Sequence, residues 1–345
     1  MKQIIIARIS ILALIITAFA FSISSCVKDT DGSPSYPAGT PVLTNIEPVE
    51  GQGGTMLTIA GTGLGDIRSA VFSSGSVPTT VTSTLNTDTH LLIRVPDTAV
   101  GGDQKIVLTN SEGKTLEIPF KVIALPILSS VFPNDFEAGS TVTITGNNLD
   151  DVSEVVIDGT TDAATIVSKT KKQLVITMPA SEVISGKLKV TNLSGFTVST
   201  QVFTNIDKAV QVFTDNLKNG FESWSWGGAY APSTEAFITG TSSMKAVFDA
   251  GGWGGMQLGN SGSIDASACR YFAFWAKGAD VDFDVQVTVN WGPWKGFTIP
   301  AKTWTYFKFD LLTAGWSNLN AVNNVTFQIK GADKTFYFDN IVFLK

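Results

Sequence analysis

The chain has 345 residues, of which 43% are apolar and only 16% are charged, and its formal net charge is -6. This length allows two or three domains. Together with 32 Gly and 13 Pro, the composition excludes a coiled coil, a disordered chain and a polytopic membrane protein. An acidic chain without a basic cluster is also a poor binder of nucleic acid, since neutralisation of phosphates dominates that affinity. The composition is typical of a β-rich extracellular protein.

The N-terminus has the pattern of a secretion signal. A short basic segment precedes residues 9–23, which carry no charge and are mostly apolar. That stretch is shorter than the ~20 residues that a helix needs to span a bilayer, and it ends in Ile-Ser-Ser-Cys at residues 23–26. Small residues before a cysteine resemble a bacterial lipobox, which implies a signal peptide at 1–25 and lipidation of Cys26. The alternative is an ordinary signal with an incidental cysteine.

Residues 26–40 are polar, with Pro and Gly, and predict a flexible tether because they cannot bury apolar surface. Asp29 and Asp31 resemble the acidic export signal that sends lipoproteins of Bacteroidota to the outer face of the outer membrane. With Cys26 lipidated, Cys269 has no partner for a disulfide. It precedes an apolar run, so we expect a small buried residue.

Two internal repeats follow the tether. The motif Pro-x-x-x-x-Ile/Val-x-Pro recurs at residues 41–48 and 126–133, an offset of 126 − 41 = 85, and Thr-Ile-x-Gly recurs at the same offset. The repeats predict tandem modules at 41–124 and 125–206. Short β-branched runs of alternating polarity, separated by Gly, Asn and Pro, predict that each is an antiparallel β-sandwich.

These motifs resemble the IPT/TIG family of immunoglobulin-like domains over residues 41–206. The resemblance implies two β-sandwich modules that act as stiff spacers from the membrane. The single histidine, His90, has no Ser, Cys or metal-binding partner in its motif, and we expect it to be structural or solvent-exposed. Neither module contains a Trp or a convergent carboxylate motif.

The composition changes from about residue 207, because all eight Trp and four of the five Tyr lie in 207–345. About eight short strand-like runs with no helix signal predict a jelly-roll β-sandwich. The whole chain is therefore expected to be all-β, with two tandem immunoglobulin-like sandwiches followed by a jelly roll. Its eight strands are expected from β-branched and aromatic runs at 244–248, 255–258, 271–276, 282–290, 297–299, 305–311, 324–330 and 336–344.

Four motifs of this segment, at 220–222, 274–278, 304–307 and 337–341, resemble jelly-roll carbohydrate-binding modules. The whole layout resembles the surface glycan-binding lipoproteins of Bacteroidota polysaccharide-utilisation systems. That resemblance implies capture of a neutral polysaccharide by the C-terminal domain, for uptake and degradation, with a β-glucan (mixed-linkage glucan or xyloglucan) as the expected ligand. It also implies the outer membrane at the cell surface as location, and an outer-membrane transporter complex and a companion glycan-binding lipoprotein as partners.

Sugar rings present apolar C–H faces and a rim of hydroxyls, so their site needs exposed aromatic rings beside polar groups. Trp275 and Trp304 are expected to pack inside. For Trp316 the sequence allows two roles: it either caps the sandwich or contacts a ligand. Trp beside glycine is harder to bury, and the stacking candidates are Trp224, Trp226, Trp253, Trp291 and Trp294. Strand alternation adds the outward polar candidates Gln257, Gln286, Asn290 and Gln328.

Two other functions are compatible with parts of this pattern. A protein-binding surface adhesin would also expose Trp. A glycoside hydrolase or lyase normally needs two placed carboxylates, but the Trp-rich segment has only two Glu, at 222 and 235, and its Asp residues form no motif. We therefore predict no catalytic residues, no enzyme activity and no cofactor. Glu222 and Asp339 are weak candidates for ligands of a structural Ca²⁺ of the kind that related jelly rolls hold.

Overall fold

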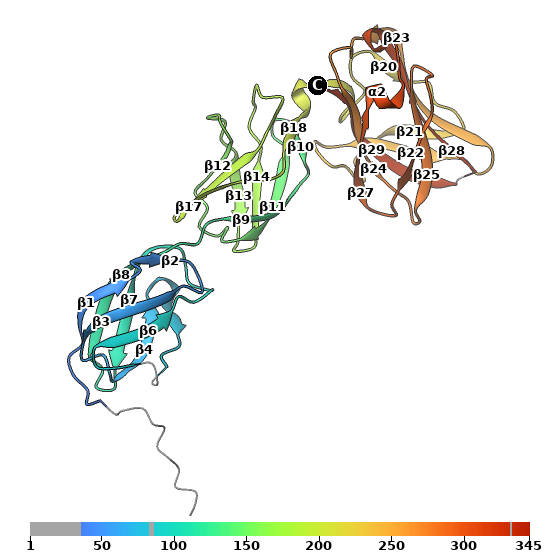
Figure 1. Ribbon diagram of the computed structural model, residues 1–345. Helices are drawn as coiled ribbons and strands as arrows, with labels where there is room; N and C mark the ends of the chain where they lie inside the picture. Colours follow the sequence, from blue (N-terminus) through green and yellow to red (C-terminus); the bar gives the residue numbers. More distant parts are fainter. Residues whose placement is uncertain (1–35, 83–85, 332) are drawn as a thin grey trace, which may run out of the picture. The chain divides into compact units, whose positions relative to one another are not determined.

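The computed structural model describes residues 36–82, 86–331 and 333–345 (Figure 1). The predicted signal peptide, Cys26 and most of the predicted tether lie outside the described residues. The chain divides into two compact units that separate after Ala124. No helix in the described ranges is long and apolar enough to cross a bilayer.

The first unit is a sandwich of two sheets. Its elements are β1 (Val42–Glu47), β2 (Glu50–Gly51), β3 (Met56–Thr62), β4 (Ile67–Phe72), the 3-10 turn η1 (Ser74–Ser76), β5 (Val77–Thr79), β6 (His90–Arg94), β7 (Gly102–Asn110) and β8 (Thr115–Val122). One sheet has the order β1-β3-β6 and the other β2-β8-β7-β4-β5. Along β3, Leu57 and Ile59 are buried and alternate with the more exposed residues Met56, Thr58 and Ala60, the two-residue period of a strand with one face in the core. His90 is exposed, with Nδ1 3.0 Å from the Thr89 hydroxyl.

The second immunoglobulin-like domain begins the second unit and repeats this arrangement. Its strands are β9 (Ile127–Phe132), β10 (Asp135–Phe136), β11 (Thr141–Asn147), β12 (Glu154–Ile157), β13 (Thr165–Lys169), β14 (Gln173–Thr177), β15 (Ser185–Gly186), β16 (Leu188–Asn192), β17 (Gly195–Val198) and β18 (Phe203–Asn205). They form sheets β13-β14-β11-β9, β12-β16-β17 and β10-β18-β15. The antiparallel pairing of β9 with β11 corresponds to that of β1 with β3, as the repeated motifs predict.

The C-terminal domain is a sandwich of two larger sheets. Its elements are η3 (Ile206–Lys208), β19 (Val210–Phe213), β20 (Phe221–Ser223), β21 (Gly228–Ser233), β22 (Ser243–Phe248), β23 (Trp253–Ile264), β24 (Tyr271–Lys277), β25 (Phe283–Val289), β26 (Lys295–Ile299), β27 (Trp304–Asp310), α2 (Leu311–Ala314), η4 (Leu319–Ala321), β28 (Val322–Lys330) and β29 (Lys334–Leu344). We call β20-β23-β28-β25-β26 the front sheet. The back sheet is β21-β22-β29-β24-β27, with β19 also paired to β29.

The all-β fold class is confirmed, and all eight strands expected in the C-terminal segment are present as β22–β29. The short strands β19, β20 and β21 were not predicted, because their few residues lack a clear alternation. The single helical turn α2 was not predicted either. Asp310 caps this turn by accepting hydrogen bonds from the backbone N–H groups of Leu312 and Thr313, and Gly315 ends it in the left-handed region at φ 71°.

Phenylalanine rings fill the space between the front and back sheets. Phe327 contacts Phe274 and Phe338 at centroid distances of 4.8 and 4.7 Å. Trp316 is also buried, edge-on to Phe272 at 5.7 Å, and its Nε1 donates to the Pro293 carbonyl at 2.8 Å. Trp316 therefore caps this core, which is the first of the two alternatives predicted for it, and it is not exposed for contact with a ligand.

The remaining residues expected inside are buried to different degrees. Trp275 is only 4% exposed and Cys269 is buried, which confirms burial for both residues, but Trp275 is not part of the core between the two sheets. Trp304 is half-buried. Trp275 alternates with the core residue Phe274, so its side chain leaves the opposite face of the back sheet, where the second immunoglobulin-like domain covers it.

Candidate functional site

The outer face of the front sheet, turned away from the core, is defined by side-chain alternation. In β28, Val325, Phe327 and Ile329 belong to the core cluster. Successive side chains of a strand point to opposite faces. The outer face of β28 therefore carries Asn324 and Thr326, which are buried, and Gln328 and Lys330, which are accessible.

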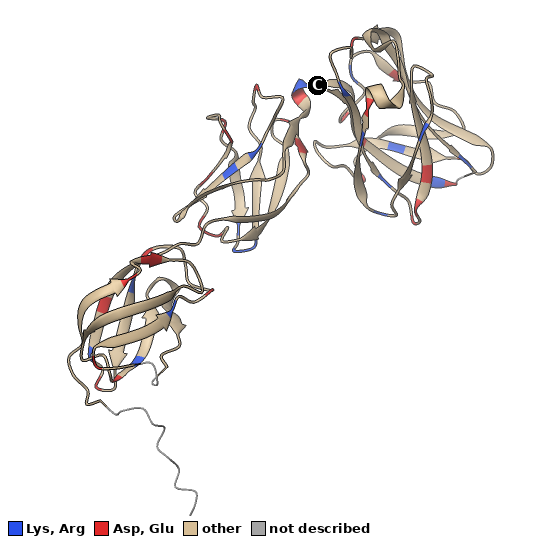
Figure 2. Cartoon of the chain, in the orientation of Figure 1, with Lys and Arg blue, Asp and Glu red and all other residues tan. Residues whose placement is uncertain are grey.

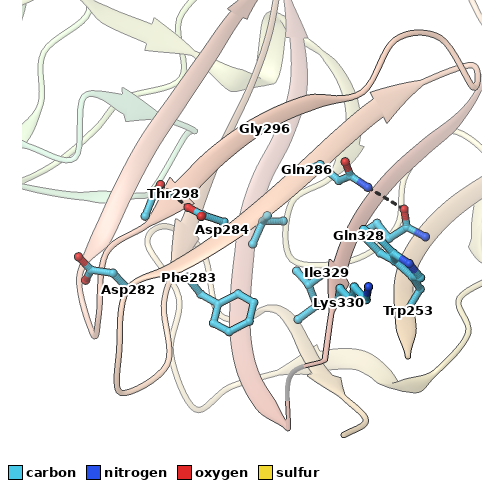
Figure 3. Close-up of a pocket in the computed structure, with 11 residues that line it drawn as sticks. Trp253, Asp282, Phe283, Asp284, Gln286, Gly296, Thr298, Gln328, Ile329 and Lys330 are labelled. Atoms are coloured by element: carbon cyan, nitrogen blue, oxygen red, sulfur yellow. Dashed lines mark hydrogen bonds between the residues drawn. The ribbon is translucent and has the colours of Figure 1, made fainter. Parts of the chain in front are cut away.

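Polar side chains of neighbouring strands meet on this face. Gln286 of β25 lies directly opposite Gln328 of β28, and its Nε2 donates to Gln328 Oε1 at 2.9 Å. One row along, the Thr298 hydroxyl of β26 donates to Asp284 Oδ1 at 2.6 Å. Figure 3 shows both contacts on the same surface. The face therefore offers amide and carboxylate groups whose remaining atoms can bond to hydroxyls.

Strand β23 has an unusual outer face, because glycines occupy two of its positions. The outward residues are Trp253, Gly255, Gln257 and Gly259, alternating with the core residues Met256 and Leu258. The segment after β20 runs beside this strand: Trp226 and Gly255 exchange two backbone hydrogen bonds of 2.9 Å, and Trp224 N donates to Gln257 O at 2.8 Å. The indole of Trp226 lies over Gly255 and that of Trp224 over Gly259.

Trp253 forms one end of this aromatic line. It pairs with Lys330 across β23 and β28, and the Lys330 Nζ lies 5.9 Å from the centre of its ring. An open depression of about 680 Å³ extends from Trp253 over Gln328 and Gln286 to Asp282 and Asp284. In Figure 3, Trp253, Gln328 and Lys330 gather on one side of this depression and the two carboxylates lie on the other.

Trp291 and Trp294 lie at the tip of the β25–β26 hairpin, edge-on to each other at 6.4 Å. The Thr288 hydroxyl donates to the Gly292 carbonyl at 2.9 Å, which draws the tip toward the outer face. Asn290 has its amide occupied, because Nδ2 donates to carbonyls of residues 317, 318 and 321 and Oδ1 accepts from Asn323 N. This amide anchors the hairpin instead of reaching into the depression.

The candidate rings are accessible: the exposed fractions are 44% for Trp224, 50% for Trp253, 57% for Trp291 and 36% for Trp294, and Trp226 is half-buried. The structure therefore gathers Trp224, Trp226, Trp253, Gln257, Gln286 and Gln328 on one face. Trp291 and Trp294 lie at an edge of it. In Figure 2 the charged residues of this domain are scattered, with both signs interspersed.

The two weak calcium candidates are not brought together. Glu222 is exposed on β20 of the front sheet, whereas Asp339 is buried on β29 of the back sheet. Asp339 Oδ2 accepts a hydrogen bond of 2.8 Å from Ile238 N, and Oδ1 accepts one of 2.9 Å from Asn340 N. Within residues 36–82, 86–331 and 333–345, no group of three or more His, Cys, Asp or Glu could hold a metal ion.

Several residues of this surface were not predicted from the sequence to be part of the site. Asp282, Asp284 and Lys330 line the depression but were not among the predicted site residues. Gly255 and Gly259 were not recognised as the floor beneath the indoles. A signal existed, since glycine at an outward strand position often marks the close approach of another group.

Comparison with known proteins follows the same division of the chain. The IPT/TIG domain family matches residues 41–122 and 126–205, so these two segments are IPT/TIG domains, as their motifs predicted. A comparison with curated proteins finds no match.

Three solved structures are similar over most of the chain. The surface glycan-binding protein PbSGBP-B from Prevotella bryantii is 15% identical with a TM-score of 0.51, covering 90% of this chain and 99% of that one. SGBP-B from a complex xyloglucan utilization locus of Bacteroides uniformis is 18% identical with a TM-score of 0.43, covering 89% and 100%. SGBP-B from a mixed-linkage glucan utilization locus of Bacteroides ovatus is 15% identical with a TM-score of 0.35, covering 92% and 76%. The Prevotella match confirms the predicted resemblance at the level of the fold.

Proposed function

We propose that this protein is a non-catalytic, surface-anchored glycan-binding protein that captures a neutral polysaccharide on the outer face of the front sheet. The observation that carries the proposal is the line of Trp224, Trp226 and Trp253 along β23, beside the amides of Gln286 and Gln328. The rings supply rigid apolar area at low conformational-entropy cost. The amides supply donors and acceptors for the hydroxyls at the edge of a sugar ring.

The dimensions of this face favour an extended chain as the ligand. The outward positions of β23 from Trp253 to Gly259 span about 20 Å at ~3.3 Å per residue. The depression next to Trp253 is open, so it does not block the path of a long chain that continues past this ring. A β-glucan, such as mixed-linkage glucan or xyloglucan, has an extended backbone of this kind.

The remaining parts of the chain support capture at the cell surface. A lipid on Cys26 would anchor the protein to the outer membrane, and the two IPT/TIG domains would hold the C-terminal domain away from it. Capture there serves uptake if the protein works beside an outer-membrane transporter and a companion glycan-binding lipoprotein. These roles extend the binding function, which rests on the C-terminal domain.

The carboxylates of the C-terminal domain are arranged to support structure, which argues against a hydrolase. A general acid needs a raised pKa, but hydrogen bonds from Lys245 and Tyr337 lower the pKa of the exposed Glu235. Asp282 Oδ1 accepts from Ala301 N at 2.8 Å, and Asp284 Oδ1 accepts from the Thr298 hydroxyl. Glu222 and Glu235 lie beside different sheets.

Affinity electrophoresis of the mature protein tests the proposal. Native gels are cast with mixed-linkage glucan, xyloglucan, xylan or mannan, and a non-binding protein of similar mass serves as reference. We expect retardation by at least one neutral polysaccharide, strongest for a β-glucan. Retardation by none of them would contradict the proposal and favour the protein-binding adhesin, and release of reducing sugar during long incubation would favour the hydrolase.

A further inference from the structure

We propose that Gly255 and Gly259 are positioning residues for glycan binding: their missing β-carbons let the indoles of Trp226 and Trp224 lie flat on β23 and form a track parallel to this strand. The inference rests on the proposed function and adds to it the direction of the bound chain. It also assigns the shape of the binding surface to two residues that do not touch the ligand.

The indoles of Trp224 and Trp226 each turn one ring face toward β23. A β-carbon built on Gly259 would lie within 3.0 Å of three consecutive atoms of the Trp224 six-membered ring, Cδ2, Cε3 and Cζ3. A β-carbon on Gly255 would likewise meet Cη2, Cζ2 and Cε2 of Trp226. An edge-on approach would leave the flanking atoms much farther away than the nearest one. Each glycine therefore lies under the face of its indole.

This stacking leaves the outer face of each indole accessible. One face of each indole is covered by backbone, so the opposite face is the one available to a ligand. The backbone of Trp226 is held to Gly255 by two hydrogen bonds of 2.9 Å, which prevents the ring from sliding along the strand. The ring faces are therefore positioned before the ligand arrives, which lowers the entropy cost of binding.

The indoles follow one another along β23, which sets the direction of the track. The two glycines are four residues apart on one strand, about 13 Å at ~3.3 Å per residue, with Gln257 between them on the same face. Trp253 continues the line on the far side of Gly255. On one side the amide of Gln328 in β28 flanks the line, since Gly255 pairs with Gln328, whereas Thr326, opposite Gln257, is buried. A polysaccharide chain parallel to β23 meets the rings in succession and the amides along one edge.

A methyl group at either glycine would fill the space that an indole occupies, and the indole would have to lift from the sheet. The three nearest atoms to each added β-carbon belong to the indole side chain, so the strand pairing itself need not change. Gly262, in the same strand, provides a matched control. An added β-carbon there has as its nearest neighbour only Asn260 Oδ1 at 3.4 Å, an ordinary contact.

The experiment measures binding to the retarding polysaccharide by isothermal titration calorimetry for Gly255→Ala, Gly259→Ala and Gly262→Ala. We expect about a tenfold loss of affinity or more for the first two, the scale of a displaced interface anchor, and no change for the third. In the ligand-free protein, acrylamide quenching of Trp fluorescence should increase for Gly255→Ala and Gly259→Ala and not for Gly262→Ala.

A double-mutant cycle separates positioning from a general defect. If Gly255 acts through Trp226, then Gly255→Ala should cause no further loss of affinity once Trp226→Ala has removed the ring, and the two variants should also be non-additive in the midpoint of urea unfolding. Full affinity in Gly255→Ala and Gly259→Ala, or additive effects in the cycle, would overturn the inference while leaving the binding function intact. If the wild-type protein binds no polysaccharide, the proposed function fails. Quenching and the unfolding cycle then still decide whether the glycines hold the rings flat.

Discussion

The indole Nε1 of Trp275 donates a 2.8 Å hydrogen bond to the carboxylate of Asp135, which belongs to the second IPT/TIG domain. Asn340 Nδ2 donates to the same oxygen at 3.1 Å, and the ring of Phe132 meets the indole edge-on at 5.5 Å. These contacts explain why Trp275 is buried although it leaves the outer face of the back sheet. They join the second IPT/TIG domain to the C-terminal domain within one compact unit.

Replacement of Asp135 by Ala removes the acceptor of two buried donors. Leaving buried donors without a partner costs about 1–3 kcal/mol, so we expect the unfolding free energy of the second unit to fall by that amount. Urea unfolding followed by Trp fluorescence measures the change. The matched control is Asp150→Ala, an exposed carboxylate of the same domain, and equal midpoints for the two variants would contradict the prediction.

Two buried carboxyls make stability depend on pH. Burial raises the pKa of Asp135 to about 6 and that of Asp339 to about 8, and the charge of Asp135 contributes to the latter. Because the folded state then holds more protons than the unfolded state between about pH 4 and pH 8, these groups make stability fall as pH rises through that window.

The variant Asp339→Asn keeps an acceptor and removes the titration of this carboxyl. We expect its unfolding free energy to fall less than that of the wild type between pH 5 and pH 8, by up to about 1.4 kcal/mol per pH unit for the proton no longer retained. Urea unfolding at both pH values gives the two slopes. Equal slopes would show that Asp339 is ionised across the window.

Trp224→Ala and Trp253→Ala should weaken binding without unfolding the domain. Both rings are roughly half exposed, so their loss removes ligand contact and little core packing. We expect about a tenfold loss of affinity for the retarding polysaccharide. Trp316→Ala is the converse control, because this buried ring should cost about 3–5 kcal/mol of stability. A reversed pattern in calorimetry and thermal unfolding would place the ligand elsewhere.

Gln328→Ala should lower affinity through lost hydrogen bonds. It removes an amide from the outer face and leaves Gln286 Nε2 without its protein acceptor. A net contribution of about 0.5–1.5 kcal/mol per hydrogen bond corresponds to a loss of about two- to tenfold. Titration of the same polysaccharide measures it, and Asn323→Ala, an exposed change in the same strand, should leave affinity unchanged.

Trp291→Ala tests how far the ligand reaches. The hairpin tip lies at the edge of the outer face, away from the depression beside Trp253. We therefore expect the variant to lose affinity for a long polysaccharide but little for a short oligosaccharide that occupies the track on β23. Calorimetry with both ligands gives the two affinities, and equal losses would place Trp291 in the centre of the site.

Local sequence patterns predicted those elements whose residues alternate strongly. The core positions of β25 and β28, such as Val287 and Phe327, are spaced by two, and the outward positions of Gln286 and Gln328 follow from them. Strands β20 and β21 contain Gly, Ser and Pro, so they pair only because β23 and β22 lie beside them. The line of indoles on β23 could not be predicted, because it depends on this pairing.

Strand periodicity, repeats and composition are local properties, and they were enough to predict the all-β class, the two repeated domains and the separation of every Trp into the last segment. The surroundings of each Trp depend on the tertiary structure. Trp275 is buried because another domain covers the back sheet, and Trp226 is presented flat because a glycine from a distant part of the sequence lies beneath it. The apolar run predicted that Trp275 is buried but not what buries it, because that depends on which distant residues pack against the outer face of the back sheet.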